Sequence, residues 1–179
     1  MKTDFIMAVM PIIVAPDPRL KIKAKSVDKV DDAVRTLMDD MLETMHSANG
    51  IGLAAPQVGD DRRVIVLDVA GQDEDPAPMY MANPQIIDVG DDDRIHEEGC
   101  LSLPEHFAEV TRPDRVKIRY LDRDNEIREI EADELLSTCI QHEIDHLDGI
   151  LFVDHVSALK RNMILRKLVK AKKLAHQPA

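Results

Sequence analysis

Aromatic residues are scarce in this chain of 179 residues: they make up 3% of it, and tryptophan is absent. Proteins that hold single-stranded nucleic acid stack bases on aromatic side chains, so this composition argues against that class. The net charge of −11 also argues against general nucleic-acid binding, which needs Lys and Arg to neutralise phosphates. The hydrophobic core must therefore consist mainly of aliphatic side chains and methionine.

Cysteine is also rare, and long apolar segments are missing. Cys100 and Cys139 could form one disulfide at most, which is a weak signal; in a cytoplasmic protein, free or metal-ligating thiols are expected instead. No apolar stretch approaches the roughly 20 residues of a membrane helix. The apolar run 6–15 is broken by Pro11 and lacks a clear signal-peptide cleavage pattern, so it predicts a first strand. We expect a cytoplasmic protein.

Hydrophobic periodicity predicts three helices and several short strands. Helices are expected over about 31–46, over 133–147 with Asp133 as N-cap and Gly149 as the stop, and over 157–174. Strands are expected over 64–69, 79–81, 85–89, 116–121 and 127–130. Because strands and helices do not alternate regularly, we predict an α+β fold with small mixed or antiparallel sheets, in one domain spanning residues 1–179.

The second predicted helix carries an H-E-x-x-H pattern formed by His142, Glu143 and His146. Residues four apart stand above one another on one helix face, so both imidazoles can reach one metal ion. Glu143 then lies beside the ion, where it can exchange a proton with water. The plainer alternative is a chance pair of surface histidines on a charged helix. On the metal hypothesis this helix is the centre of the fold, with the sheets around it.

A catalytic metal usually has a third protein ligand and an open position. Cys139 is three residues before His142, but its Cα would lie about 10 Å along the helix from that of His146 at a rise of 1.5 Å per residue. Ligand atoms on one tetrahedral ion are only about 3.5 Å apart, so Cys139 is better interpreted as a pocket wall or a core thiol. Cys100 lies on a separate element, where a lone cysteine is commonly a small buried hydrophobe. These arguments therefore do not identify the third ligand.

Three segments together resemble the signature motifs of the peptide deformylase family, in the bacterial form. They are residues 50–57 (GIGLAAPQ), 98–102 (EGCLS) and 141–149 (QHEIDHLDG), in the family's order. Residues 16–20 and 116–119 are also similar, so the resemblance covers nearly the whole chain. It implies a hydrolase that removes the N-formyl group from the initiator methionine of new proteins and releases formate, as a step of protein biosynthesis.

The resemblance also implies roles for individual residues. The metal ligands would be Cys100, His142 and His146. Glu143 would move the proton, while the Gln57 side-chain amide and the Leu101 backbone N–H would stabilise the oxyanion. Gly50, Ile51 and Gly52 would pair with the substrate as an added strand, which suits glycine because another backbone can approach closely. The walls of the methionine pocket would be Ile51, Leu135, Thr138, Cys139 and His142.

This chain departs from the family at Thr138 and near His96, positions that are often aliphatic, so the shape and polarity of the methionine pocket are open. The resemblance implies Fe²⁺ as the metal, although imidazole and thiolate ligands also suit zinc, nickel or cobalt. Two other functions use the same motif. A zinc peptidase would leave Cys100 and Gln57 without a role, and a structural metal site would usually have four protein ligands.

The last predicted helix is strongly basic on an otherwise acidic chain. No acidic residue occurs after Asp154, and seven cations there leave a net charge of −18 on the rest of the chain. In the simplest interpretation this helix packs an apolar stripe on the body and exposes its basic face to solvent. The resemblance implies a second role, docking on the ribosome, and oriented approach to a polyanion fits this charge distribution. Partners in membranes or DNA are not expected.

Overall fold

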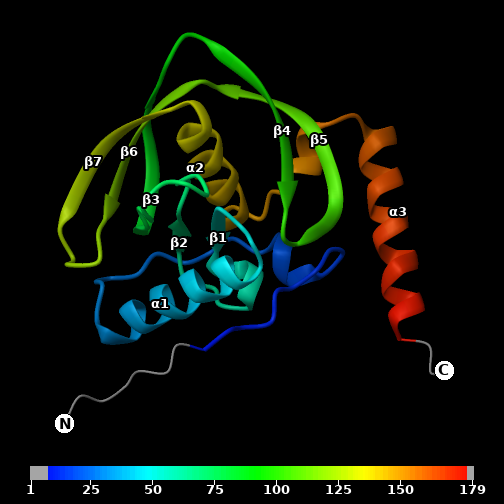
Figure 1. The fold of residues 1–179 in the computed structure, drawn as a ribbon, viewed down its shortest axis with the longest axis horizontal. Helices are drawn as coiled ribbons and strands as arrows, with labels where there is room; N and C mark the ends of the chain where they lie inside the picture. The colour runs from blue at the N-terminus through cyan, green and yellow to red at the C-terminus, as the bar shows by residue number, and fades with distance from the viewer. Residues whose placement is uncertain (1–7, 177–179) are drawn as a thin grey trace.

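The computed structural model describes residues 8–176. Its helices are α1 (Asp32–Ser47), α2 (Glu134–Leu147) and α3 (Ala158–Ala175), with single 3-10 turns at η1 (Pro18–Lys21), η2 (Ala55–Val58) and η3 (Phe152–His155). Its strands are β1 (Gly52–Ala54), β2 (Val64–Leu67), β3 (Met79–Val89), β4 (Asp93–Cys100), β5 (Leu103–Pro113), β6 (Arg115–Leu121) and β7 (Ile127–Asp133). The predicted α+β class is confirmed (Figure 1).

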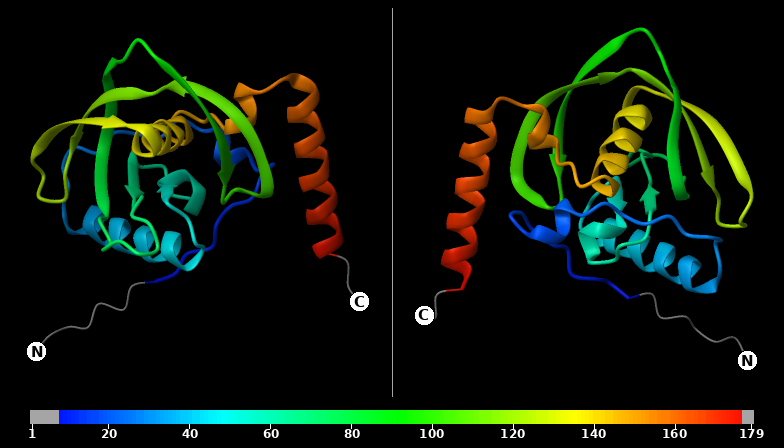
Figure 2. Two further views of the ribbon diagram at one scale, coloured as in Figure 1. Left: turned by 45° about the horizontal axis from the view of Figure 1, so that its top comes forward. Right: turned by 180° about the vertical axis from the view of Figure 1, so that it is seen from behind.

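The strands form two antiparallel sheets, one of five strands in the order β1-β2-β3-β6-β7 and one of two strands, β4-β5. The α2 helix lies between them and contacts strands of both sheets, as Figures 1 and 2 show. Its apolar residues Ile140, Ile144 and Leu147 belong to a core cluster with Leu67 and Ile118 of the larger sheet. The helix with the H-E-x-x-H pattern is thus the centre of the fold, as predicted.

Local sequence explains how the two body helices begin and end. The Asp31 side chain caps α1 by accepting from the Val34 N–H, which offsets one unpaired donor at the helix start. Asp133 is the N-cap residue of α2, as predicted, although its side chain makes no cap hydrogen bond. Gly149 follows α2 with φ +75°, and a Cβ there would lie 2.5 Å from the Lys21 carbonyl oxygen. This position therefore requires glycine, as a helix stop does.

The expected first strand is wrong over residues 8–15, which belong to no strand, while residues 6 and 7 lie outside the described part of the chain. The Ile13 N–H donates to the Gln57 carbonyl and the Ala15 N–H to the Ser102 carbonyl. The segment therefore runs between two different elements and pairs with neither along its length. Its apolar character comes from burial of side chains such as Ala15 in the core beside β5.

Two further differences concern strands. The separate strands predicted over 79–81 and 85–89 form one strand, β3, with its pairing register shifted between Ala82 and Gln85. Asn83 lies in this irregularity with φ 51°, as expected of a bulge that inserts an unpaired residue. The β4-β5 hairpin was not predicted, because it is rich in charged residues and buries only every second side chain over part of its length.

The C-terminal helix α3 is confirmed close to its predicted bounds, with Ser157 as its N-cap. It packs on η3 and stands at the side of the body, away from the larger sheet (Figures 1 and 2). Only Ile164 and Leu168 of this helix are buried, whereas Leu159 and Met163 are exposed. The expected apolar stripe is therefore only partly covered. Within residues 8–176, the helices lack the length and apolar character needed to cross a membrane.

Candidate metal centre and pocket

The structure brings Cys100, His142 and His146 together. Cys100 ends β4, and the two histidines lie one turn apart on α2. Their ligand atoms all lie within 4.8 Å of one another, and Cys100 Sγ is 3.2 Å from His146 Nε2. Tetrahedral metal sites place donor atoms about 3.5 Å apart, so these spacings suit one ion. Cys139 lies outside this cluster and points to the Ile51 carbonyl oxygen at 3.6 Å.

A buried carboxylate orients His142. The His142 Nδ1–H donates to Glu98 Oε2 at 2.8 Å, which leaves Nε2 as the free nitrogen for a metal, an arrangement typical of metal-binding histidines. Burial opposes ionisation of Glu98, but hydrogen bonds from His142 and Arg112 outweigh it and lower the pKa of this carboxyl to about 2. Glu98 is therefore a carboxylate at neutral pH.

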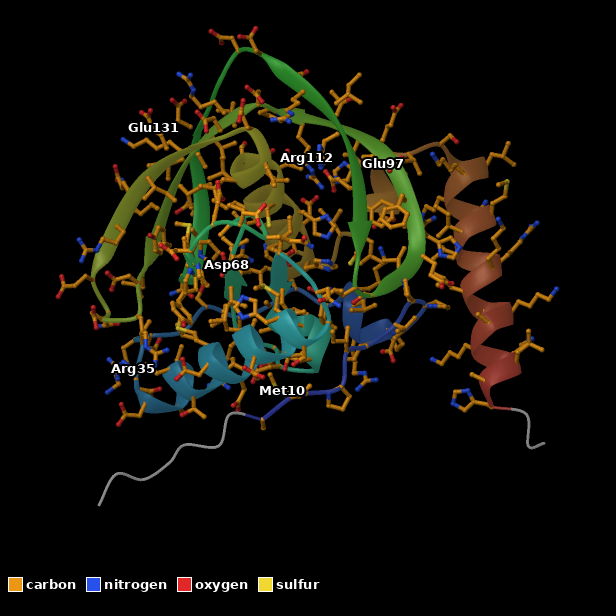
Figure 3. The ribbon with its side chains drawn as sticks, viewed as in Figure 1. Met10, Arg35, Asp68, Glu97, Arg112 and Glu131 are labelled. Atoms are coloured by element: carbon orange, nitrogen blue, oxygen red, sulfur yellow. The ribbon has the colours of Figure 1, made fainter. Side chains whose placement is uncertain are left out.

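Arg112 on β5 holds this carboxylate and ties it to α2. Its Nε donates to Glu98 Oε1 at 2.5 Å and its Nη2 to Glu98 Oε2 at 3.0 Å, while its Nη1 donates to Asp145 Oδ2 at 2.8 Å. The Arg112 and Glu98 side chains are 6% and 3% exposed, so this is a buried, bidentate ion pair. Figure 3 shows Arg112 in the interior, beside α2. His155 adds a second contact to Asp145 at 2.7 Å.

The protonation of the two histidines fits a cation site. Burial lowers the pKa of His146 far below its ordinary value, and the neighbouring His142 charge lowers it further, so His146 is a neutral imidazole that can ligate. Burial opposes a charge on His142, but Cys100 and Glu98 together raise its pKa. These groups thus attract positive charge to the space between them, and a metal that binds there displaces the proton. The donor set fits a divalent transition metal.

Glu143 is buried beside this cluster, and burial raises the pKa of its carboxyl to about 7. Among the described residues, its Oε2 atom has no protein hydrogen-bond partner. The other carboxylate oxygen lies where a Cβ on Gly52 would stand, and such a Cβ would also be 2.9 Å from Cys139 Sγ. Glycine at position 52 is therefore needed for room. No hydrogen bond holds the Glu143 carboxyl among the described residues, so it is available to exchange a proton near the ligands.

The Gln57 side chain is held with its amide nitrogen towards Cys100. Its Oε1 accepts from the Ala54 N–H at 2.9 Å, and its Nε2 donates to Ser102 Oγ at 3.1 Å and approaches Cys100 Sγ at 3.5 Å. Because the Ala54 N–H donates to the side-chain oxygen of Gln57, the NH₂ group of Gln57 faces the ligand cluster. Gln57 is 1% exposed, so its orientation is set by these contacts and not by solvent.

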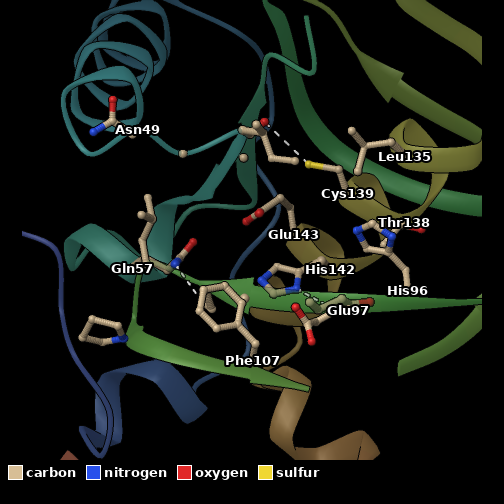
Figure 4. A pocket seen from close by; sticks show the side chains of 18 of the residues that line it. Asn49, Gln57, His96, Glu97, Phe107, Leu135, Thr138, Cys139, His142 and Glu143 are labelled. Carbon is tan, nitrogen blue, oxygen red and sulfur yellow. Dashed lines mark hydrogen bonds and ion pairs between the residues drawn. The ribbon is translucent and has the colours of Figure 1, made fainter. Parts of the chain in front are cut away.

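A pocket of about 490 Å³ opens beside the cluster (Figure 4). The site residues predicted from the sequence line it, except His146, which is buried within the ligand cluster. Leu135, Thr138 and Cys139 of α2 form one wall, and His96 of β4 also lines the pocket (Figure 4). Thr138 and His96, the two polar residues at positions where an aliphatic residue is more usual, therefore both line the pocket.

Sequence reasoning missed the residues that support the ligands. Glu98 lies inside one of the quoted motifs, yet no partner for it could be named, and Arg112 carries no local signal. Ser102, which accepts from Gln57, is likewise inside a motif without an assigned role. A buried Arg or Glu is rare unless it is paired. The sequence did not reveal that Glu98 and Arg112 are buried, because the strands that carry them are rich in other charged residues.

Comparison with known proteins is consistent across the chain. The family described as Polypeptide deformylase matches residues 9–162. A peptide deformylase from Methylocella silvestris is 57% identical over 174 residues, covering 96% of this chain and 89% of that protein. One from Phenylobacterium zucineum is 53% identical over 169 residues, covering 94% of this chain and 100% of that protein.

Solved structures agree. The crystal structure of peptide deformylase from Ehrlichia chaffeensis superposes with a TM-score of 0.90 at 38% identity, covering 94% of this chain and 99% of that one. A peptide deformylase from Legionella pneumophila gives a TM-score of 0.87 at 43% identity, covering 96% of this chain and 100% of that one. A second Ehrlichia chaffeensis structure, in complex with actinonin, gives 0.88 at 40% identity, covering 92% of this chain and 98% of that one.

Proposed function

The chain belongs to the polypeptide deformylase family of metal-dependent hydrolases, which remove the N-formyl group from the N-terminal methionine of new proteins, and we propose that Cys100, His142 and His146 hold its metal. The observation that carries this assignment is the convergence of these three ligand atoms beside a buried carboxylate with one free oxygen, Glu143 Oε2. We further propose that the chain is one catalytic domain and works in the cytoplasm.

The proposed reaction adds water to the formamide carbonyl and releases formate and a free α-amine. A divalent cation, when bound, lowers the pKa of water from 15.7 towards about 7 and polarises the carbonyl. Glu143 Oε2 accepts the proton of the attacking water and later delivers it to the departing nitrogen. A pKa near 7 suits both halves of this exchange.

Gln57 and Leu101 are proposed to stabilise the negative charge that develops on the formyl oxygen. The Gln57 Nε2 atom faces the ligand cluster because Ala54 holds its Oε1. The Leu101 backbone N–H follows Cys100 directly in the chain. Donors held in place before the reaction act most strongly, and loss of one typically costs about 3 kcal/mol of barrier.

The peptide substrate is proposed to lie as an added strand along residues 50–52, with its methionine side chain against Leu135, Thr138 and Cys139. The neighbouring strand β1 is at the edge of the five-stranded sheet, where a peptide can add as a further strand. The pocket volume of about 490 Å³ lies in the range of small-ligand sites. Ile51, between the two glycines, and His142 complete the proposed walls.

The direct test is formate release from an N-formyl-methionyl tripeptide by anaerobically purified protein. Formate is expected from this peptide, and no acetate is expected from the N-acetyl analogue, because the pocket must hold the small formyl group against the ligands. Hydrolysis of internal peptide bonds, independent of the formyl group, would point to a peptidase instead. Metal-replete protein that yields no formate would contradict the assignment.

We propose Fe²⁺ as the native metal. Two imidazoles and a thiolate suit several transition metals, but ferrous iron beside a thiolate is open to oxidation. Anaerobically purified protein is therefore expected to contain iron and to lose both iron and turnover on exposure to air, while protein reconstituted with Ni²⁺ keeps its activity. The check is metal content by mass spectrometry beside turnover. Equal metal content and equal turnover in aerobic and anaerobic preparations would exclude iron.

We propose that α3 docks the enzyme on the ribosome. The helix carries only basic charges, is largely exposed and stands at the side of the body. Replacing Lys170 and Lys173 by glutamine is expected to weaken ribosome binding. The slope of the logarithm of the binding constant against the logarithm of the salt concentration should fall by about one unit per lost phosphate contact. Matched replacements of Lys23 and Lys29, exposed on the body, serve as the control. Equal binding by both pairs in low salt would contradict docking through α3.

A further inference from the structure

Thr138 brings a hydroxyl group into the wall against which the methionine side chain is proposed to lie. The residue lines the pocket and is only 5% exposed. Within residues 8–176 its hydroxyl makes no hydrogen bond, whereas Thr36 and Thr44 of α1 each donate to the carbonyl oxygen four residues earlier. Buried polar groups are hydrogen-bonded as a rule. The Thr138 hydroxyl is therefore suited to a partner that comes from a bound molecule.

The other polar groups of this wall already have partners. Cys139 Sγ donates to the Ile51 carbonyl oxygen at 3.6 Å. His142 donates from Nδ1 to Glu98 at 2.8 Å and keeps its other nitrogen for the proposed metal. The rest of the proposed wall is aliphatic. Among these wall residues, all in the described part of the chain, Thr138 thus provides the free hydrogen-bond donor.

A second polar side chain, His96, lines the same pocket from β4. His96 is two residues before Glu98, so both side chains point to one face of the strand, and Glu98 contacts His142 of α2 from that face. Thr138 is four residues before His142, so these two share a helix face. His96 and Thr138 therefore lie on the faces that β4 and α2 turn to each other (Figure 4).

The His96 ring is a further available donor. It makes no hydrogen bond within the described residues and is half-buried. An imidazole carries at least one N–H donor whether it is neutral or charged. The pocket thus offers two donors, one from each wall, to the side chain that enters it.

These two donors suit an oxidised methionine better than an ordinary one. A thioether sulfur is only a weak acceptor, so a methionine side chain excludes water from the Thr138 hydroxyl without replacing its hydrogen bond, which costs free energy. Oxidation to the sulfoxide keeps the length of the side chain and adds a polar oxygen. That oxygen can accept from both donors, and one added atom is small beside a pocket volume of about 490 Å³.

From these observations we propose that the protein also deformylates peptides whose first residue is methionine sulfoxide. The inference rests on the proposed deformylase activity and adds a second class of substrate for the same site. Thr138 and His96 bind the sulfoxide oxygen and take no part in proton transfer. The reaction itself is unchanged: water adds to the formyl carbon, the C–N bond breaks, the nitrogen gains a proton and formate leaves. The sulfoxide group stays intact.

The test compares formyl-Met-Ala-Ser with the same peptide carrying methionine sulfoxide, as each of its two epimers. The readout is kcat/KM for the sulfoxide peptide divided by kcat/KM for the methionine peptide, from formate release, so a general change in activity cancels. Wild-type protein is expected to deformylate at least one epimer. Thr138→Val, which replaces the hydroxyl by a methyl group, should lower this ratio about three- to tenfold, the usual effect of one hydrogen bond.

Thr138→Ser should retain the wild-type ratio, and His96→Leu should lower it by a factor similar to that of Thr138→Val. The matched control is Thr111→Val, because Thr111 is exposed on β5 and does not line the pocket; its ratio should equal that of wild-type protein. An unchanged ratio in Thr138→Val or in His96→Leu would overturn the proposed role of that residue.

Two further outcomes separate this inference from the proposed function. Formate from the methionine peptide but from neither sulfoxide epimer would overturn the inference alone. Absence of formate from all of the peptides would instead overturn the deformylase activity itself.

Discussion

Replacing Glu143 by glutamine is expected to lower kcat for deformylation by roughly 10²–10⁴, the usual contribution of a positioned general base. Glutamine has the same shape but cannot accept the proton of water. The free Oε2 atom is the group that the reaction would use. The measurement is formate release at saturating formyl-methionyl peptide, with metal content determined on the same sample.

This loss should occur without a loss of stability. Burial raises the pKa of Glu143 to about 7, which means that its ionised form is costly in this place. A neutral amide removes that cost, so the free energy of unfolding should be unchanged or higher in Glu143→Gln. Glu131→Gln, at an exposed position of β7, is the control and should match wild-type activity. A Glu143→Gln variant that keeps its metal and most of its turnover would exclude Glu143 as the base.

Replacing Arg112 by methionine is expected to reduce the free energy of unfolding by about 3–5 kcal/mol, because removing one partner of a buried ion pair leaves a buried charge uncompensated. Arg112 is the cation that faces both Glu98 and Asp145. Glu98 in turn orients His142, so the variant should also bind its metal about 10–100-fold more weakly, as is typical when support behind a metal ligand is lost. Urea unfolding and competition with a chelator measure the two effects.

The matched control is Arg119→Met. Arg119 donates to Glu129 on the neighbouring strand, but its side chain is 52% exposed, and solvent-exposed ion pairs contribute little to stability. Arg112→Lys should fail to restore metal affinity, because a lysine cannot make the bidentate contact to Glu98. An Arg112→Met variant as stable as Arg119→Met, with unchanged metal affinity, would remove Arg112 from the support of the metal centre.

Prediction of the fold from the sequence was most accurate where a pattern is local. The α1 and α2 helices follow from apolar residues at spacings of three and four, and β2 follows from a short buried apolar run. The segment 8–15 was misread, since an apolar run buried between two elements has the same composition as a buried strand. The β4-β5 hairpin was missed because its strands are rich in charged residues, although they pair along their length.

The H-E-x-x-H spacing alone determined that His142 and His146 share one helix face with Glu143 beside them, because helix geometry links residues four apart regardless of the rest of the chain. Family resemblance then supplied Cys100 and Gln57. Only the tertiary structure decided that Arg112 and Glu98, 14 residues apart on paired strands, form a buried pair behind His142. It likewise placed Phe107 over Gly99 at the pocket mouth. Such contacts depend on strand register and burial, which arise from packing distant segments together and leave no local pattern in the sequence.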